Sequence, residues 1–149
     1  MTYSPILAPV VALALWSCVI FVWLYATRLP AMRRAGIDLR SRVGSRGCDL
    51  EGIVPDRVQW VSHNYNHLME QPTLFYAVAI AAAMLDRGDD LNLSLAWAYV
   101  ALRVVHSLIQ VTSNRVKYRG GAFGLMSLVL VALTAHLLLQ LAYDLAVRG

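Results

Sequence analysis

Two stretches of this chain carry polar and ionisable residues at helical spacing inside otherwise apolar surroundings. In the first stretch they recur every three or four positions, at His63, Asn66, Glu70 and Thr73. That spacing places these four residues on one face of a helix, whereas His67 lies off the stripe. Ionisable residues are costly inside an apolar span, so each one is a candidate for function.

The second stretch repeats the pattern, at Arg103, His106, Gln110 and Asn114. At a rise of about 1.5 Å per residue, Glu70 lies about 22 Å and Arg103 about 18 Å from the turn that joins the two stretches. We therefore expect Glu70 and Arg103 to meet at similar depth as a buried ion pair. Pro72 is expected to bend the first stretch beside its polar face, because it leaves a backbone carbonyl without a donor.

Both stripes continue toward an end of the molecule where basic residues converge, namely Arg28, Arg115, Lys117 and Arg119. Two polar faces, a matched ion pair and several arginines together describe a pocket for an anionic ligand that also carries a cationic group. Polar stripes can also join helices without any ligand, and this alternative stays open for Glu70 and Arg103. His136, alone in the last apolar segment, is expected to be a packing residue or an interhelical hydrogen-bonder.

A metal site and a nucleophile site are both disfavoured. His63, His67 and Glu70 are residue types that bind iron or zinc. However, His67 does not share the face of the other two, and the chain has four histidines, fewer than membrane di-iron enzymes of the desaturase type use. No Gly-x-Ser-x-Gly motif is present either. We therefore predict no metal.

The composition indicates a single membrane domain over residues 1–149. Hydrophobic residues make up 58% of the chain and charged residues 15%, which leaves too little polar surface for a water-soluble fold of this size. The net charge of +4 comes mostly from two basic patches, over residues 28–57 and 115–119. Because both patches adjoin apolar spans, they indicate membrane topology, and we predict no nucleic-acid partner.

Four segments are long and apolar enough to cross a bilayer, and we predict helices at about 6–29, 58–85, 91–114 and 122–147. Short charged turns join the last three, and the Gly120-Gly121 pair is expected to break the chain before the fourth helix. The predicted fold is an all-α, up-down four-helix bundle in the membrane, with one long basic loop at 30–57. The first span is not expected to be a secretory signal peptide, since no basic residue precedes it.

The arginines of the long loop are read mainly as topology signals. They include Arg33, Arg34, Arg40, Arg42 and Arg46. Positive charge gathers on the cytoplasmic side of membrane proteins, so both basic loops are expected in the cytoplasm and both termini outside. We expect the cell inner membrane as the location.

The sequence resembles the MAPEG family (membrane-associated proteins in eicosanoid and glutathione metabolism). The strongest match is the run from Arg103 through His106 to Ser107, which is similar to the Arg-x-x-His-Thr/Ser stretch of the prostaglandin E synthase branch. Arg115 and Arg119 follow it as the family's arginines do. The run 66–70 with Pro72 is similar to the family's Asn/Glu element in helix two, and Arg28 matches an arginine at the end of helix one.

The resemblance implies a homotrimer that binds glutathione, as a co-substrate, between neighbouring subunits. By this resemblance Arg119 stabilises the glutathione thiolate and is the catalytic group. The other implied ligand-binding or orienting residues are Arg28, His63, Asn66, Glu70, Arg103, His106, Gln110 and Arg115. Glutathione has two carboxylates and one ammonium, which agrees with the pocket read from the residues. A nearby cation also favours thiolate over thiol.

Three positions depart from the family pattern. Gln110 stands where glutathione-binding members have tyrosine, Gly120 where the prostaglandin branch has serine, and Phe123 where it has another tyrosine. The leading hypothesis is a glutathione-dependent transferase or peroxidase acting on a lipophilic electrophile from the bilayer. The lost hydroxyls favour its rival, a non-catalytic lipid-binding or scaffold protein of the same fold. A small transporter is disfavoured, because no span is discontinuous.

Overall fold

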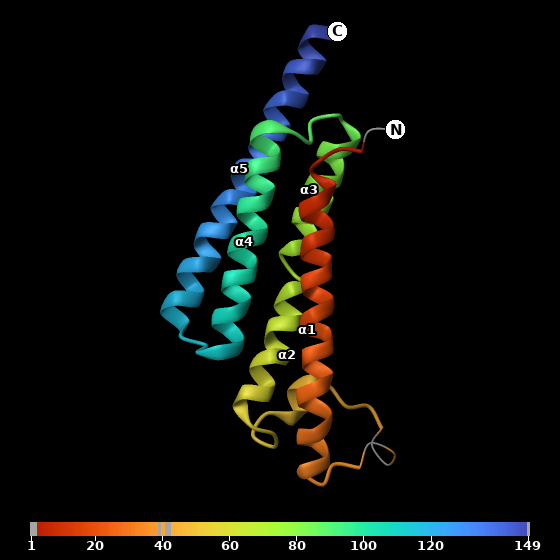
Figure 1. Ribbon diagram of the computed structural model, residues 1–149, viewed down its shortest axis with the longest axis vertical. Helices are drawn as coiled ribbons and strands as arrows, with labels where there is room; N and C mark the ends of the chain where they lie inside the picture. The colour runs from red at the N-terminus through yellow and green to blue at the C-terminus, as the bar shows by residue number, and fades with distance from the viewer. Residues whose placement is uncertain (1–2, 39, 41–42, 149) are drawn as a thin grey trace.

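This computed structural model describes residues 3–38, 40 and 43–148, and their architecture is all-helical (Figure 1). The elements in chain order are α1 (Leu7–Arg34), the 3₁₀ turn η1 (Gly47–Leu50), α2 (Asp56–Leu68), α3 (Pro72–Met84), α4 (Asp90–Thr112) and α5 (Val116–Arg148). Since α2 and α3 follow one another as a single interrupted rod, the chain forms four rods in up-down order. The predicted all-α four-helix bundle is confirmed.

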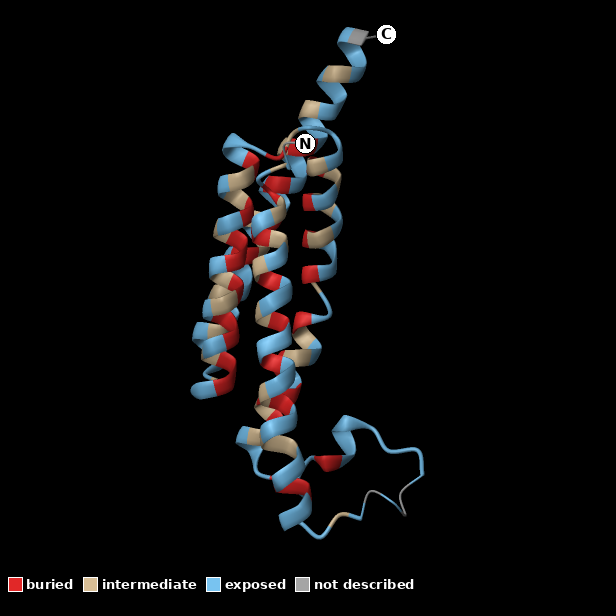
Figure 2. Cartoon of the chain, turned by 45° about the vertical axis from the view of Figure 1, so that its right-hand side comes forward, coloured by how far each residue is buried: buried red, intermediate tan, exposed pale blue. Residues whose placement is uncertain are grey.

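Three of the rods meet the requirements of a membrane span by length and composition, namely α1, α4 and α5. The outward faces of the bundle carry large exposed apolar side chains, such as Val11, Leu15, Val22, Leu128, Val131 and Leu138. Buried residues run along the inward faces (Figure 2). So much exposed apolar surface is expected where lipid rather than water surrounds a protein.

The second rod is interrupted where a continuous helix over 58–85 was expected to bend, so the expectation that no span is discontinuous is wrong. Helix α2 ends at Leu68, and α3 begins at Pro72, which occupies the first turn, where a proline needs no backbone donor. Gln71, inside the interruption, donates to Ser127 Oγ of α5 at 2.8 Å and accepts from the Tyr99 hydroxyl of α4 at 3.4 Å. These side-chain bonds tie the interruption to the other two helices.

Two helix ends lie elsewhere than the local sequence suggests. Helix α1 continues through Pro30 to Arg34 instead of ending at 29, because Ala31 and Met32 pack against Leu50 and Val54 of the loop in a small core of their own. Helix α5 begins at Val116, so the two glycines expected to break the chain before 122 lie inside its second turn. Tertiary packing overrides local propensity at both ends.

The main core lies between all five α-helices. Its centre includes Phe75 and Tyr99, whose rings stack with centroids 4.6 Å apart, and both side chains are fully buried. Near the turn between α3 and α4, His136 Nδ1 lies 2.9 Å from Asn92 Oδ1, which joins α5 to α4. The prediction that His136 is an interhelical hydrogen-bonder is confirmed.

The turn between α3 and α4 depends on a glycine. A methyl group on Gly88 would clash with Oγ of Ser4 and would lie 2.7 Å from Cγ2 of Ile6, whose side chain is fully buried. We therefore expect Gly88→Ala to lower the free energy of unfolding by about 1–3 kcal/mol. Gly121→Ala is the control, since nothing lies within 4 Å of an added methyl group there. That variant should gain about 0.5–1 kcal/mol from helix propensity.

Unfolding of both variants in the same detergent, followed by circular dichroism, checks this prediction. Opposite signs for Gly88→Ala and Gly121→Ala are expected. A neutral Gly88→Ala would mean that the amino-terminal segment around Ile6 is not packed against the turn as described.

Candidate functional site

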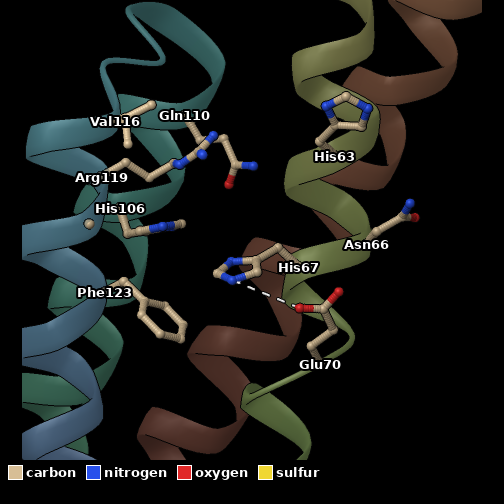
Figure 3. A pocket seen from close by; sticks show the side chains of 10 residues that line it. His63, Asn66, His67, Glu70, His106, Gln110, Val116, Arg119 and Phe123 are labelled. Carbon is tan, nitrogen blue, oxygen red and sulfur yellow. Dashed lines mark ion pairs between the residues drawn. The ribbon is translucent and has the colours of Figure 1, made fainter. Parts of the chain in front are cut away.

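A pocket of about 500 Å³ lies between α2 on one side and α4 and α5 on the other (Figure 3). It is lined by His63, Asn66, His67, Glu70, His106, Gln110, Val116, Arg119, Gly120 and Phe123. Six of the predicted site residues thus come together in one place. The volume is typical of a small-molecule site.

Arg119 is held in the pocket wall by a neighbour from the turn before it. Its Nη1 donates to Oδ1 of Asn114 at 2.6 Å. Asn114 adopts a left-handed backbone conformation, with φ of 48°, which asparagine tolerates better than most residues. Arg119 is half-buried, and its side chain extends toward the pocket beside Gln110 (Figure 3). The guanidinium therefore keeps most of its donors for a ligand.

Arg103 does not line the pocket but acts on a residue that does. Its side chain is fully buried, and its Nη1 lies 2.8 Å from Nδ1 of His106. Because a guanidinium only donates hydrogen bonds, Nδ1 of His106 must accept, and the imidazole proton sits on Nε2. Arg103 thereby sets the tautomer of His106. Its own Nε and Nη2 have no partner among the described residues.

Three aromatic rings meet between the two walls. His67 stacks on His106 with centroids 4.9 Å apart, and Phe123 lies 5.3 Å from His67 and 6.2 Å from His106. His67 was placed off the polar face from the sequence, yet its ring points to the middle of the pocket (Figure 3). The side of α2 that meets α4 carries Asn64 and His67, whereas His63 is exposed. Asn66 is likewise exposed and points away from the opposite wall.

The predicted ion pair between Glu70 and Arg103 is wrong. Glu70 is exposed, and its Oε2 lies 3.8 Å from Nε2 of His67 instead. The helical arithmetic failed because α2 ends at Leu68. Glu70 belongs to the interruption that follows, where a side chain no longer points in the direction that helical spacing dictates. Its carboxylate therefore lies at the mouth of the pocket, not beside the buried guanidinium.

Besides Arg103, two predicted ligand-binding residues, Arg28 and Arg115, do not line the pocket. Arg28 donates through Nη1 to Ser62 Oγ at 3.1 Å and through Nη2 to the carbonyl of Gly47 at 3.0 Å. It therefore connects α1, the long loop and α2. Arg115 is exposed at the turn before α5. The long loop between α1 and α2 also reaches the edge of the pocket, where Glu51 Oε1 lies 3.3 Å from Nε2 of His63.

One interhelical hydrogen bond behind the pocket was not predicted from the sequence. Asn64 is fully buried and donates through Nδ2 to Ser107 Oγ at 2.6 Å, which joins α2 to α4. Ser107 follows His106 directly, so the bond fixes the height of the two walls relative to each other. Nothing in the sequence distinguishes Asn64 from its neighbour Asn66 as the buried one.

The site offers a cation, neutral hydrogen-bond donors and a carboxylate at the opening of the pocket. Arg119 supplies the cation, His106 and Gln110 can donate hydrogen bonds, and Glu70 can accept from an ammonium group. Such a site suits a zwitterionic ligand, with a negative group beside Arg119 and a positive group beside Glu70. Within the described part of the chain, no group of three or more His, Cys, Asp or Glu residues is arranged to hold a metal ion.

Comparison with known proteins yields one result. The MAPEG family model matches residues 6–139, a range that includes every residue lining the pocket. No curated protein and no solved structure matches the chain.

Proposed function

Since this chain belongs to the MAPEG family of membrane proteins, we propose that it is a glutathione-dependent transferase or peroxidase acting on lipophilic electrophiles. The observation that supports this most is Arg119, a half-buried guanidinium fixed by Asn114 and directed into a pocket of suitable size. A cation held in this way stabilises a thiolate more than a thiol, because it interacts favourably with the negative sulfur.

The proposed reaction begins when the glutathione thiol loses its proton to solvent and its sulfur becomes an anion beside Arg119. The thiolate then attacks an electrophilic carbon and forms a carbon–sulfur bond. In a substitution a leaving group such as chloride departs with its bonding electrons, and in an addition the carbon–carbon π bond breaks and the product takes up a proton from solvent. With a hydroperoxide, the sulfur takes the terminal oxygen, the O–O bond breaks and an alcohol leaves. A second glutathione then displaces that oxygen as water and forms the disulfide.

Several residues would hold the tripeptide in this scheme. His63, His106 and Gln110 would bind its carboxylates and amides, and Glu70 with Asn66 would receive its amino end. Arg103 would act by orienting His106. We also propose a homotrimer, in which a neighbouring subunit closes the open side of the pocket. Arg28, which does not line the pocket of a single chain, would then contribute across that boundary, whereas Arg115 would stay outside the site.

The lipophilic substrate would arrive laterally from the bilayer, since apolar surface surrounds the bundle. We propose that the basic loops face the cytoplasm, where glutathione is available, and that the protein resides in the cell inner membrane.

Calorimetric titration of glutathione into the detergent-purified protein tests this function, with S-methylglutathione as a ligand that cannot form a thiolate. Saturable binding of glutathione is expected, with weaker binding of the methylated ligand and weaker binding of both by Glu70→Gln. Turnover with chlorodinitrobenzene and with a lipid hydroperoxide completes the test. No binding at millimolar glutathione would contradict the proposal.

A second candidate function is a non-catalytic lipid-binding or scaffold protein. It is favoured by the pocket lining, where Gln110, Gly120 and Phe123 present no hydroxyl group. This candidate predicts tight lipid binding, no turnover of glutathione, and unchanged lipid binding when Arg119 is replaced.

Restoring one hydroxyl should improve the thiol site. In Phe123→Tyr the new hydroxyl would extend into the pocket from the ring that contacts His67. One added hydrogen bond is worth about 0.5–1.5 kcal/mol, so glutathione should bind about 2- to 10-fold more tightly. Phe21→Tyr is the matched control, because Phe21 is exposed on α1 and does not line this pocket. Equal affinities of wild type and Phe123→Tyr would place the sulfur away from this ring.

A further inference from the structure

A second hollow, of about 520 Å³, is lined by residues of α1, of the long loop and of the start of α2. Figure 1 shows that the long loop folds back against the carboxyl end of α1. It shares no lining residue with the candidate glutathione pocket. Its walls are mainly apolar and include Ala26, Pro30, Ile53, Pro55 and Val58. Arg34 is the charged residue among those that line it.

The length of α1 indicates where this hollow lies relative to the bilayer. A helix of 28 residues is about 42 Å long, about 12 Å more than the hydrocarbon core of a bilayer. The excess lies at the carboxyl end, since the first charged residue of α1 is Arg28. The hollow begins at Ala26 and extends to Ala35. It therefore starts at the edge of the hydrocarbon and ends among the lipid headgroups.

The lining matches the chemistry found at that depth. Ile53 is 47% exposed although it is apolar, and the small core of Leu50 and Val54 holds its segment against α1. An apolar wall suits the glycerol and first methylenes of a lipid, whereas the Arg34 guanidinium suits a phosphate oxygen. No carboxylate is among the residues that line this hollow, so its walls offer no partner for the ammonium group of a tripeptide.

The surrounding charge selects among lipids. Residues 28–57 contain seven arginines and four acidic residues (Asp38, Asp49, Glu51 and Asp56), so this segment has a net charge of 7 − 4 = +3. We propose that the hollow binds one anionic phospholipid, with its phosphate on Arg34 and its acyl chains leaving beside Ala26 into the bilayer. The bound lipid joins α1 to the loop that precedes α2, and this stabilises the basic end of the protein. The proposal does not depend on the glutathione reaction.

Thermal unfolding of the detergent-purified protein during titration with phosphatidylglycerol tests the proposal, with phosphatidylcholine and inorganic phosphate as separate arms. The wild type should show saturable stabilisation by phosphatidylglycerol alone. Arg34→Ala should weaken the apparent affinity about fivefold, the equivalent of about 1 kcal/mol for one basic residue at a membrane surface. Arg33→Ala removes the same charge one residue away, outside the hollow, and should retain the wild-type response.

Each other outcome would overturn the proposal. Equal weakening in Arg34→Ala and Arg33→Ala would mean a diffuse basic patch without a built site. An equal response to inorganic phosphate would mean an anion site that takes no lipid. As a second variant, Ala35→Trp fills the hollow from an exposed position and keeps every charge. It should also lose the response, and a full response in this variant would show that the lipid binds elsewhere.

Discussion

Replacing Arg119 with alanine is expected to lower the turnover of glutathione conjugation about 100- to 1,000-fold, the usual cost of removing one group that stabilises developing or full negative charge in an active site. The reason is local. Arg119 is the cation that lines the pocket, and Asn114 holds it at 2.6 Å. Binding of the tripeptide backbone should weaken less than the rate, because in the proposed scheme other lining residues would contact the carboxylates and the amino end.

Arg115→Ala is the matched control for this prediction. Arg115 lies one helical turn earlier, is exposed and does not line the pocket of the single chain. Its replacement removes the same charge from the same end of α5. We expect a change in kcat of a few-fold at most. Equal losses in Arg119→Ala and Arg115→Ala would mean that the general positive potential of this end, and not a positioned guanidinium, supports the reaction.

Arg103→Met is expected to weaken glutathione binding more than 10-fold while the fold persists. Arg103 is fully buried and sets the tautomer of His106 through a 2.8 Å hydrogen bond. Without it, Nδ1 of His106 is free to carry the proton, and Nε2 no longer donates to a ligand. The unfolding midpoint should stay within a few degrees of wild type. Removing a buried charge whose Nε and Nη2 lack partners offsets the lost hydrogen bond.

A double-mutant cycle with His106→Ala separates this positioning role from a structural one. If Arg103 acts through His106, the two substitutions are non-additive, and Arg103→Met has little further effect on binding in the His106→Ala background. Additive losses would show that Arg103 influences the ligand by another route. A collapse of the unfolding midpoint in Arg103→Met would show that the arginine is needed mainly for folding.

The architecture was largely predictable, because it follows from apolar length and from the positions of charge. Segments of about 20 apolar residues, separated by basic or acidic turns, leave few alternatives to a membrane bundle. The two polar stripes also predicted correctly which segments of the chain face each other across the pocket. His106, Gln110 and Arg119 lie around one pocket with His63 and Glu70, as their spacing suggested.

The local geometry at the interruption was not predictable from spacing. Glu70 was assigned by helical arithmetic to a partner on α4, but the helix ends two residues before it. Gln71 stabilises that end through bonds to Tyr99 and Ser127, residues 28 and 56 positions away. Contacts between residues so far apart in the sequence do not affect the spacing of polar and apolar residues near Gln71, so that spacing could not predict them. The inward turn of His67 depends likewise on which side of α2 meets α4, which only packing decides.

The extent of α1 and α5 shows the same limit. A proline and a glycine pair are the usual signals for a helix boundary. Here Pro30 lies inside α1, and Gly120 lies inside α5. Met32 packs on the loop core in the first case, and the Arg119–Asn114 bond stabilises the first turns in the second. The loop that contains Leu50 thereby lengthens the helix that precedes it.

The central claim is that Arg119 stabilises a thiolate in this pocket. The most direct measurement is the ultraviolet absorbance of glutathione thiolate at neutral pH, recorded as glutathione is titrated into wild type, Arg119→Ala and Arg115→Ala. We predict a saturable thiolate signal in wild type and Arg115→Ala, and none in Arg119→Ala at concentrations where the ligand still binds. Glutathione that binds the wild type as a thiol, or a thiolate signal that persists in Arg119→Ala, would contradict the account.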